Sequence, residues 1–238
     1  MEQNVKANIE AVRAEIERAA RAAGRDPGEI TLCAATKVQT SETIRAAIAA
    51  GITVCGENRV QELTAHLNDD AYAGAEVHFI GHLQRNKVKY VVGKVALIQS
   101  VDGEELLSLI EKRAAALGIV QDILIEVNIG GEESKSGVTP ENAHRLAALA
   151  GEMEHVRLRG LMAIPPVATI SGENRQFFAR MRQLYVDINA KKYDNKNTMD
   201  VLSMGMSGDY ADAILEGATL VRVGTALFGP RSANRAHG

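Results

Sequence analysis

Lys37 is the residue of this sequence whose position most clearly suggests chemistry. It ends the apolar run Thr31–Thr36 and comes just before Thr40, Ser41 and Glu42, a stretch that starts a helix. At the carboxyl end of a strand in a (β/α) barrel, a lysine lies beside the loops that form active sites, partly removed from water. The position therefore predicts an amine that reacts with a small carbonyl compound.

A second candidate site follows the apolar run Thr219–Val223. Gly224 and Thr225 come next, ahead of Ala226–Phe228, which could form one helical turn with outward-pointing N–H groups. Backbone donors and the helix dipole favour an anion there. Barrels often bind phosphate in the loops after strands seven and eight, where Ser207 also falls. An ordinary turn is the alternative, but an amine beside this site favours a phosphorylated aldehyde as the ligand.

Arg222 lies on the same side of its predicted strand as Leu220 and Gly224, because side chains alternate with a period of two. One interpretation is an ion pair with Glu57 or Glu126 near the barrel mouth. The other is a fixed cation facing a heteroaromatic nitrogen. Since an arginine cannot accept a proton, it would keep a pyridine nitrogen unprotonated and weaken the ring as an electron sink.

These residues require elements that bring them to one end of a sheet, and the chain alternates strand-like and helix-like runs throughout. The predicted strands are Thr31–Thr36, Ile52–Gly56, Val77–Ile80, Val95–Ser100, Ile123–Asn128, Arg157–Ala163, Met199–Ser203 and Thr219–Val223. The predicted helices between them are Ser41–Ala50, Glu104–Leu117, Pro140–Gly151, Asn174–Ala190 and Asp209–Glu216. Glycines expected to end helices are Gly51, Gly118, Gly151 and Gly217.

An additional helix is predicted at the N-terminus, where Val5, Ile9, Val12 and Ile16 form one apolar stripe. Eight strand–helix units in about 200 residues favour an α/β fold of the closed (β/α)8 TIM-barrel type over an open doubly wound sheet. No linker divides the chain. We therefore expect one barrel domain over residues 1–238 with an extra N-terminal helix, and a flexible tail at residues 231–238.

The composition excludes several classes of partner. The chain has 27 Lys and Arg residues against 30 Asp and Glu residues, a net charge of -3, and no long basic block, which argues against nucleic acid. No apolar stretch approaches the roughly 20 residues that span a bilayer, so we expect a cytoplasmic protein without a membrane segment. Cys33 and Cys55 lie in apolar runs and are expected to be small buried thiols rather than a disulfide or metal pair.

The stretches that carry these residues resemble a known family. They are Ala35-Thr36-Lys37, Gly56-Glu57-Asn58, His78 to Gln84 with Asn86-Lys87, Val127-Asn128-Ile129 through Lys135-Ser136-Gly137, Leu158 to Ile164, Leu202 to Ser207, and Val221 to Gly229. In this order and spacing, they are similar to the pyridoxal 5′-phosphate (PLP) homeostasis proteins, which resemble the N-terminal barrel of alanine racemase. The resemblance covers nearly the whole chain from Lys37 to Gly229.

The resemblance implies that Lys37 holds PLP as an internal aldimine and that Arg222 faces the pyridine nitrogen. It implies phosphate binding by Ser207, Gly224 and Thr225. The residues implied to line the pocket are Asn58, His82 and Met204. The implied role is in vitamin B6 homeostasis, where the protein stores PLP and delivers it to apo-PLP enzymes.

Racemases with this barrel add a second β domain and a second-subunit tyrosine as the opposing acid/base. We expect neither in this chain, so catalysis is not expected. The tyrosines of this chain are Tyr72, Tyr90, Tyr185, Tyr193 and Tyr210, and none is predicted to lie at the barrel mouth. A non-enzymatic monomer is therefore expected. The alternatives are a PLP-dependent enzyme with racemase-like activity, and a Schiff-base aldolase-type barrel, which leaves Arg222 unexplained.

Lys135 lies in the glycine-rich loop after the fifth predicted strand, on the same face as Lys37. One interpretation is a solvated loop charge. The other is a second amine that accepts the aldehyde during transfer.

Overall fold

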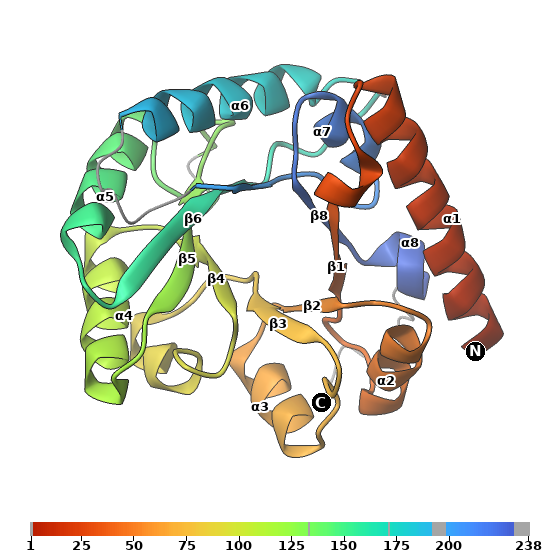
Figure 1. Ribbon diagram of the computed structural model, residues 1–238, viewed down its shortest axis with the longest axis horizontal. Coiled ribbons are helices and arrows are strands. Elements are labelled where there is room, and N and C mark those ends of the chain that lie inside the picture. The colour runs from red at the N-terminus through yellow and green to blue at the C-terminus, as the bar shows by residue number, and fades with distance from the viewer. Residues whose placement is uncertain (1, 133, 171, 192–198, 231–238) are drawn as a thin grey trace.

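Eight parallel strands close into a barrel inside a ring of helices in the computed structural model, which describes residues 2–132, 134–170, 172–191 and 199–230 (Figure 1). The strands pair in chain order, and the last pairs with the first. They are β1 Thr31–Ala35, β2 Val54–Glu57, β3 Glu76–Phe79, β4 Leu97–Val101, β5 Gln121–Val127, β6 Val156–Ala163, β7 Val201–Ser203 and β8 Leu220–Val223. Each overlaps one predicted strand, so the predicted (β/α)8 barrel is confirmed. The predicted tail, residues 231–238, lies outside the described residues.

The helices include every one that the sequence predicted. They are α1 Glu2–Ala22, α2 Ser41–Ala49, α3 Val60–Asn68, α4 Glu104–Leu117, α5 Pro140–Glu152, α6 Arg175–Ala190, α7 Tyr210–Leu215 and α8 Thr225–Phe228, with 3-10 turns η1 Pro27–Glu29 and η2 Arg85–Tyr90. Three of these elements, α3, η1 and η2, were not predicted. A start signal is missing for α3, because Arg59 at its N-cap makes no capping hydrogen bond.

The apolar stripe of α1 is buried as predicted, with Val5, Ile9, Val12 and Ile16 all exposed by less than a tenth. This helix packs along α7 and α8 on the outside of the barrel (Figure 1). Asn8 Nδ2 donates to the Leu227 carbonyl over 2.9 Å. The extra helix therefore supports the short helix α8 that follows the last strand.

Glycine ends three of the four helices for which this was predicted. Gly51, Gly118 and Gly217 have positive φ values. The prediction for Gly151 was wrong, since this residue lies inside α5, which continues to Glu152. The next residue, Met153, is extended, so this helix ends without a left-handed residue.

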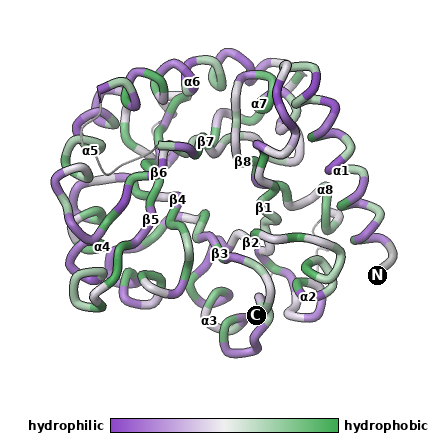
Figure 2. The backbone as a smooth tube through the Cα atoms, in the orientation of Figure 1, coloured by the Kyte–Doolittle hydropathy of each residue, from purple (hydrophilic) through white to green (hydrophobic). Residues whose placement is uncertain are grey.

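Side chains of the strands alternate between two cores. Leu32 and Ala34 pack in the large core between strands and helices, whereas Cys33, Ala35 and Leu220 pack inside the barrel. Figure 2 shows hydrophilic residues over much of the outer side of the helix ring. This alternation decides which strand residues face the barrel interior.

Both cysteines are free and buried, which confirms their prediction as core thiols. Burial raises the pKa of Cys33 above its ordinary value, and it raises the pKa of Cys55 to about 12. Neither thiol is therefore a nucleophile near neutral pH.

Gly160 marks an irregularity in β6. The pairing of β5 with β6 shifts register there, and Gly160 has φ 152°. A Cβ atom at this position would lie 1.7 Å from the carbonyl oxygen of Val201 in β7. Only glycine lets the two strands approach this closely.

Candidate functional site

The predicted site residues gather at the carboxyl end of the barrel. All strands are parallel and closed, so the residues that follow each strand meet at one end. Lys37 follows β1, Asn58 follows β2, and His82 follows β3. Residues Met204 and Ser207 follow β7, while Gly224 and Thr225 follow β8 and Arg222 lies within it.

The backbone on both sides of Lys37 is held by buried side chains. Thr36 is fully buried, and its hydroxyl donates to Glu57 Oε1 over 2.6 Å. On the other side, the Val38 amide donates to Glu62 Oε2 over 3.1 Å. Val38 has φ 58°, which is strained for a β-branched residue. The turn that presents Lys37 is therefore determined by tertiary contacts.

Glu57 organises the cluster beneath that turn. Its Oε1 atom accepts from the Tyr72 hydroxyl at 2.8 Å and lies 3.1 Å from His66 Nδ1. The other ring nitrogen of His66 lies 3.1 Å from the Gln39 carbonyl oxygen. The hydrogen bond to Glu57 raises the pKa of His66 above its ordinary value. This cluster was not predicted, since His66 lies on the unpredicted helix α3 and Tyr72 lies in the turn after it.

Arg222 is buried, and neutral groups hold its guanidinium. Nη1 donates to the Ser203 hydroxyl over 2.5 Å, and Nη2 donates to the Ala163 carbonyl over 2.9 Å. The predicted ion pair with Glu57 or Glu126 is not observed: within the described part of the chain, Arg222 has no ion-pair partner within 4.0 Å. Burial lowers the pKa of Arg222 from its ordinary value, yet the group stays protonated at neutral pH.

Ser207 and the loop after β8 form a small cluster of backbone donors. The amides of Gly224 and Ala226 both donate to Ser207 Oγ, over 3.1 and 3.2 Å. Thr225 is exposed as the first residue of α8. Two convergent amides, a hydroxyl and a following helical turn are the groups that bind a phosphate in proteins.

The three residues expected to line the pocket differ in their surroundings. Asn58 is half-buried, and its Oδ1 atom is buried without a hydrogen-bond partner. His82 is largely exposed, with Nδ1 3.2 Å from Asp102 Oδ2. Met204 is fully buried and packs in the large core between strands and helices. Asn58 and His82 are thus the members of this group with polar atoms available at the mouth.

Glu126 is a buried carboxylate that the sequence analysis considered only as an ion-pair partner. It is 6 % exposed, and its Oε2 atom has no hydrogen-bond partner. Burial, with Asp102 nearby, raises the pKa of Glu126 to about 7. The mouth therefore contains a carboxyl group that changes charge near neutral pH.

Lys135 ties two loops of this end together. Its amine donates to the Pro165 carbonyl over 3.0 Å and pairs with Glu132. These contacts join the loop after β5 to the loop after β6. The structure therefore favours a role in loop structure over a solvated charge.

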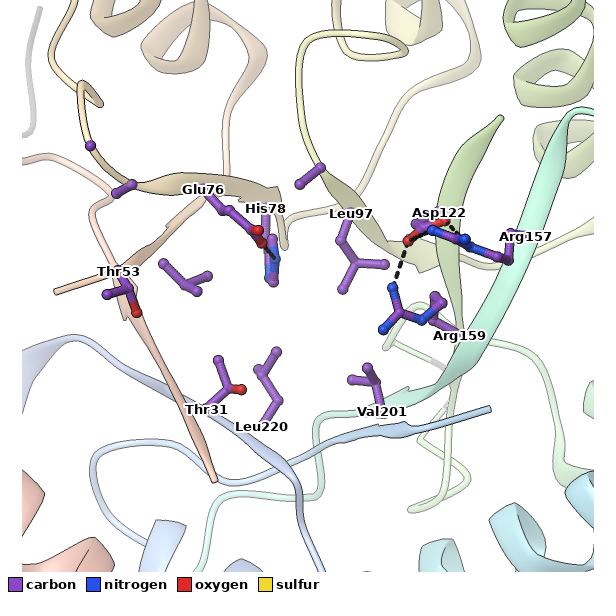
Figure 3. Close-up of a pocket in the computed structure, with 14 residues that line it drawn as sticks. Thr31, Thr53, Glu76, His78, Leu97, Asp122, Arg157, Arg159, Val201 and Leu220 are labelled. Carbon is purple, nitrogen blue, oxygen red and sulfur yellow. Dashed lines mark hydrogen bonds and ion pairs between the residues drawn. The ribbon is translucent and has the colours of Figure 1, made fainter. Parts of the chain in front are cut away.

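The opposite end of the barrel contains a cavity of about 880 Å³ (Figure 3). The first residues of the strands line it, and its charged groups bind one another. Asp122 accepts two hydrogen bonds from Arg157, at 2.6 and 2.7 Å, and one from Arg159 at 2.7 Å. Arg159 continues to Asp200. Charges satisfied in this way indicate a stabilising structure at the end of the barrel where active sites are not found.

Metal-binding clusters and membrane-spanning helices are both absent from the described residues. Among residues 2–132, 134–170, 172–191 and 199–230, no group of three or more His, Cys, Asp or Glu side chains could hold a metal ion. In the same part of the chain, no helix has the length and apolar character needed to cross a bilayer.

Known proteins resemble the chain over nearly its whole length. The family model for the alanine racemase N-terminal domain matches residues 5–232. A pyridoxal phosphate homeostasis protein from Aquifex aeolicus is 44 % identical over 228 residues, covering 96 % of this chain and 99 % of that protein. A protein of the same name from Pseudomonas aeruginosa is 41 % identical over 225 residues, covering 94 % of each chain.

A solved structure shows the same similarity. PipY of Synechococcus elongatus, determined with PLP bound, is 31 % identical with a TM-score of 0.78, covering 90 % of this chain and 100 % of that one. The chain therefore belongs to the alanine racemase N-terminal domain family and, within it, to the pyridoxal phosphate homeostasis proteins.

Proposed function

We propose that this protein binds PLP at the carboxyl end of the barrel, stores it, and delivers it in vitamin B6 homeostasis. One observation carries the proposal: an amine, a buried guanidinium and a pair of convergent amides meet at that end of a closed barrel. They match the three polar parts of PLP, namely its aldehyde, its ring nitrogen and its phosphate. The PLP-bound structure of the relative PipY supports the choice of ligand.

The residues present fit this cofactor. Ser207, Gly224 and Thr225 would hold the phosphate, since the amides of Gly224 and Ala226, on either side of Thr225, converge on the Ser207 hydroxyl. Arg222 would face the pyridine nitrogen. The unpartnered Asn58 Oδ1 atom suits a polar ligand at the mouth, with His82 beside it, whereas Met204 would contribute through its backbone because its side chain packs in the core between strands and helices.

Lys37 would hold the cofactor covalently. Its neutral amine adds to the aldehyde, and loss of one water leaves a carbon–nitrogen double bond, with no change of oxidation state. When bound, PLP supplies an electron sink for amino-acid chemistry. A cationic Arg222 would reduce that capacity by keeping the ring nitrogen unprotonated.

We infer binding and delivery rather than turnover. Tyr72 donates its hydroxyl to Glu57, and Tyr185 donates its hydroxyl to the Met199 carbonyl, so both are committed within the core. Solvent deuterium entering Cα of an added L-amino acid over repeated cycles would instead support the racemase-like alternative.

The remaining parts of the proposal concern the whole protein. We propose that residues 1–238 form one PLP-binding domain, that the protein acts as a monomer in the cytoplasm, and that apo-PLP enzymes are its recipients. Analytical ultracentrifugation with and without PLP tests the monomer. Activation of a purified apo-enzyme by the loaded protein tests delivery.

The central test is mass analysis after incubation with PLP and borohydride reduction. We expect one reduced adduct on Lys37 in the wild-type protein and none in Lys37→Ala. Lys87→Ala is a matched control, since Lys87 lies after β3 and its amine lies 5.7 Å from the centre of the Tyr90 ring. An adduct that persists in Lys37→Ala, or a wild-type protein that stays colourless with PLP, would overturn the proposal.

A further inference from the structure

A chain of hydrogen bonds runs through the barrel interior from Arg222 to the opposite end. Arg222 donates to Ser203 Oγ, Ser203 Oγ donates to Gln99 Oε1 over 2.7 Å, and Gln99 Nε2 lies 3.0 Å from His78 Nδ1. The four residues belong to four different strands. All are buried, with exposures of 3 %, 0 %, 0 % and 5 % in that order.

The Gln99 amide has its oxygen toward Ser203 and its NH₂ group toward His78, and in this orientation the chain has one donor direction. An arginine can only donate, so the Ser203 oxygen accepts from it and passes its own hydrogen to Gln99. The amide oxygen of Gln99 is then the acceptor, and its NH₂ group donates to His78 Nδ1. His78 must therefore be neutral, with its hydrogen on Nε2. Burial lowers the pKa of His78 to about 4, and Arg159 acts in the same direction, which agrees with a neutral ring.

The far end of the chain reaches the ion-paired cavity. His78 lines this cavity beside Glu76, whose Oε2 atom is 3.7 Å from His78 Nε2 (Figure 3). The charged groups that act on the His78 ring from other strands are Asp122 in β5 and Arg159 in β6, which are bound to each other. The chain therefore ends in the wall of this cavity, at a ring on which the Asp122–Arg159 pair acts through its charges.

We propose that Ser203, Gln99 and His78 are positioning residues that hold Arg222 in one orientation with neutral partners, so that it meets the cofactor ring with its full positive charge. This rests on the proposed function. A carboxylate in place of any member would neutralise part of the charge of Arg222. The ring nitrogen could then hold a proton more easily, as it does in PLP enzymes where an acidic side chain faces it. The neutrality of the chain is therefore what favours an unprotonated ring nitrogen.

Two variants that remove one link each test this role. In Ser203→Ala, Arg222 loses the acceptor for Nη1, and we expect PLP to bind about tenfold more weakly. We expect a similar loss for Gln99→Leu, together with a changed absorption spectrum of bound PLP at saturation. The matched control is Ser100→Ala, because Ser100 is also fully buried but its hydroxyl has no hydrogen-bond partner. It should bind PLP within about twofold of the wild type.

A third variant tests neutrality at constant shape. Gln99→Glu replaces the amide by a carboxylate, so we expect His78 to become protonated and the spectrum of bound PLP to shift. Circular dichroism confirms that each variant is folded. The spectral change is decisive, because a merely structural residue would alter stability and leave the spectrum of the bound cofactor unchanged.

The state of His78 is measured separately in the protein without PLP. Long-range ¹H–¹⁵N NMR should show a neutral ring protonated on Nε2 at pH 7. A ring protonated on Nδ1 would overturn the inference, as would Ser203→Ala and Gln99→Leu variants that match Ser100→Ala in affinity and spectrum. Wild-type protein that binds no PLP would overturn the proposed function and this inference together, whereas unchanged spectra with intact binding overturn the inference alone.

Discussion

The two ends of the barrel use charge in different ways. At the amino end, Asp122 binds both Arg157 and Arg159, and Arg159 also binds Asp200. At the carboxyl end, the buried Arg222 binds only neutral acceptors, and Glu126 keeps an unpartnered oxygen. The buried charges at the amino end pair with one another, whereas the buried Arg222 and Glu126 at the carboxyl end do not.

This difference distinguishes structural charge from functional charge. Ion pairs that are complete within the protein stabilise it and need no ligand. Buried polar groups with missing partners cost free energy in the protein alone, so Asn58 Oδ1 and Glu126 Oε2 are candidates for contact with a ligand. The cavity at the amino end is therefore the less suitable site, although it is large.

The largest effect is expected at Gly160, which lies between the two ends on β6. In Gly160→Ala, the new methyl group would collide with the Val201 backbone, and we expect a loss of at least about 3 kcal/mol in the free energy of unfolding, or failure to fold. Urea denaturation measures this. Gly103→Ala is the control, since no atom lies within 4 Å of its Cβ position. Equal stability of the two variants would contradict a required close approach.

Breaking the charge cluster at the amino end should destabilise the protein without changing PLP binding. Asp122→Ala leaves two arginines without their shared partner, and we expect a loss of about 2 kcal/mol in the free energy of unfolding. This loss is smaller than the loss expected for a fully buried ion pair, because Arg157 is half-exposed. Asp200→Asn removes the more exposed acid and should cost less than about 1 kcal/mol. A large fall in PLP affinity for Asp122→Ala in folded protein would show that the ends are not separate.

Removing the charge of Glu126 should stabilise the protein at high pH. A folded-state pKa of about 7 exceeds the ordinary value of 4.5, so the folded state holds its proton longer than the unfolded state. The contribution of Glu126 to the free energy of unfolding is fully present below pH 4.5 and is lost as the pH rises through about 7. We expect Glu126→Gln to be more stable than the wild type by about 2 kcal/mol at pH 8 and by little at pH 4. An equal difference at both pH values would refute the assigned titration.

The smallest effect is expected in the cluster beneath Lys37. The pKa of His66 is raised, so its pairing with Glu57 stabilises the protein below pH 6.5, and this stability is lost as the pH rises through the folded-state value. Glu57→Gln should therefore cost about 1 kcal/mol more at pH 6 than at pH 9. Glu111→Gln, which removes the partner of the more exposed His155, is the control, with an expected loss in the free energy of unfolding below about 1 kcal/mol. Loading of Lys37 with PLP should also be slower in Glu57→Gln, as followed by absorbance.

Much of the fold was predictable because its signals are local. Short apolar runs marked all eight strands, and an apolar stripe at helical spacing marked α1. The short helix α3 was missed because it has no capping side chain. The position of Lys37, Ser207 and Gly224 after strands was also readable, since parallel closure alone brings strand ends together.

The sequence by itself determined that strands and helices alternate and that chemically active residues follow the strands, because both depend on spacing along the chain. Only the tertiary structure decided how those residues are held. Ser203 and Gln99 are 104 positions apart, and their hydrogen bond depends on the register of strands across the closed barrel. The neutral partners of Arg222 and the burial of Glu126 follow from the same closure, because hydrogen bonding and desolvation depend on distance in space rather than along the chain.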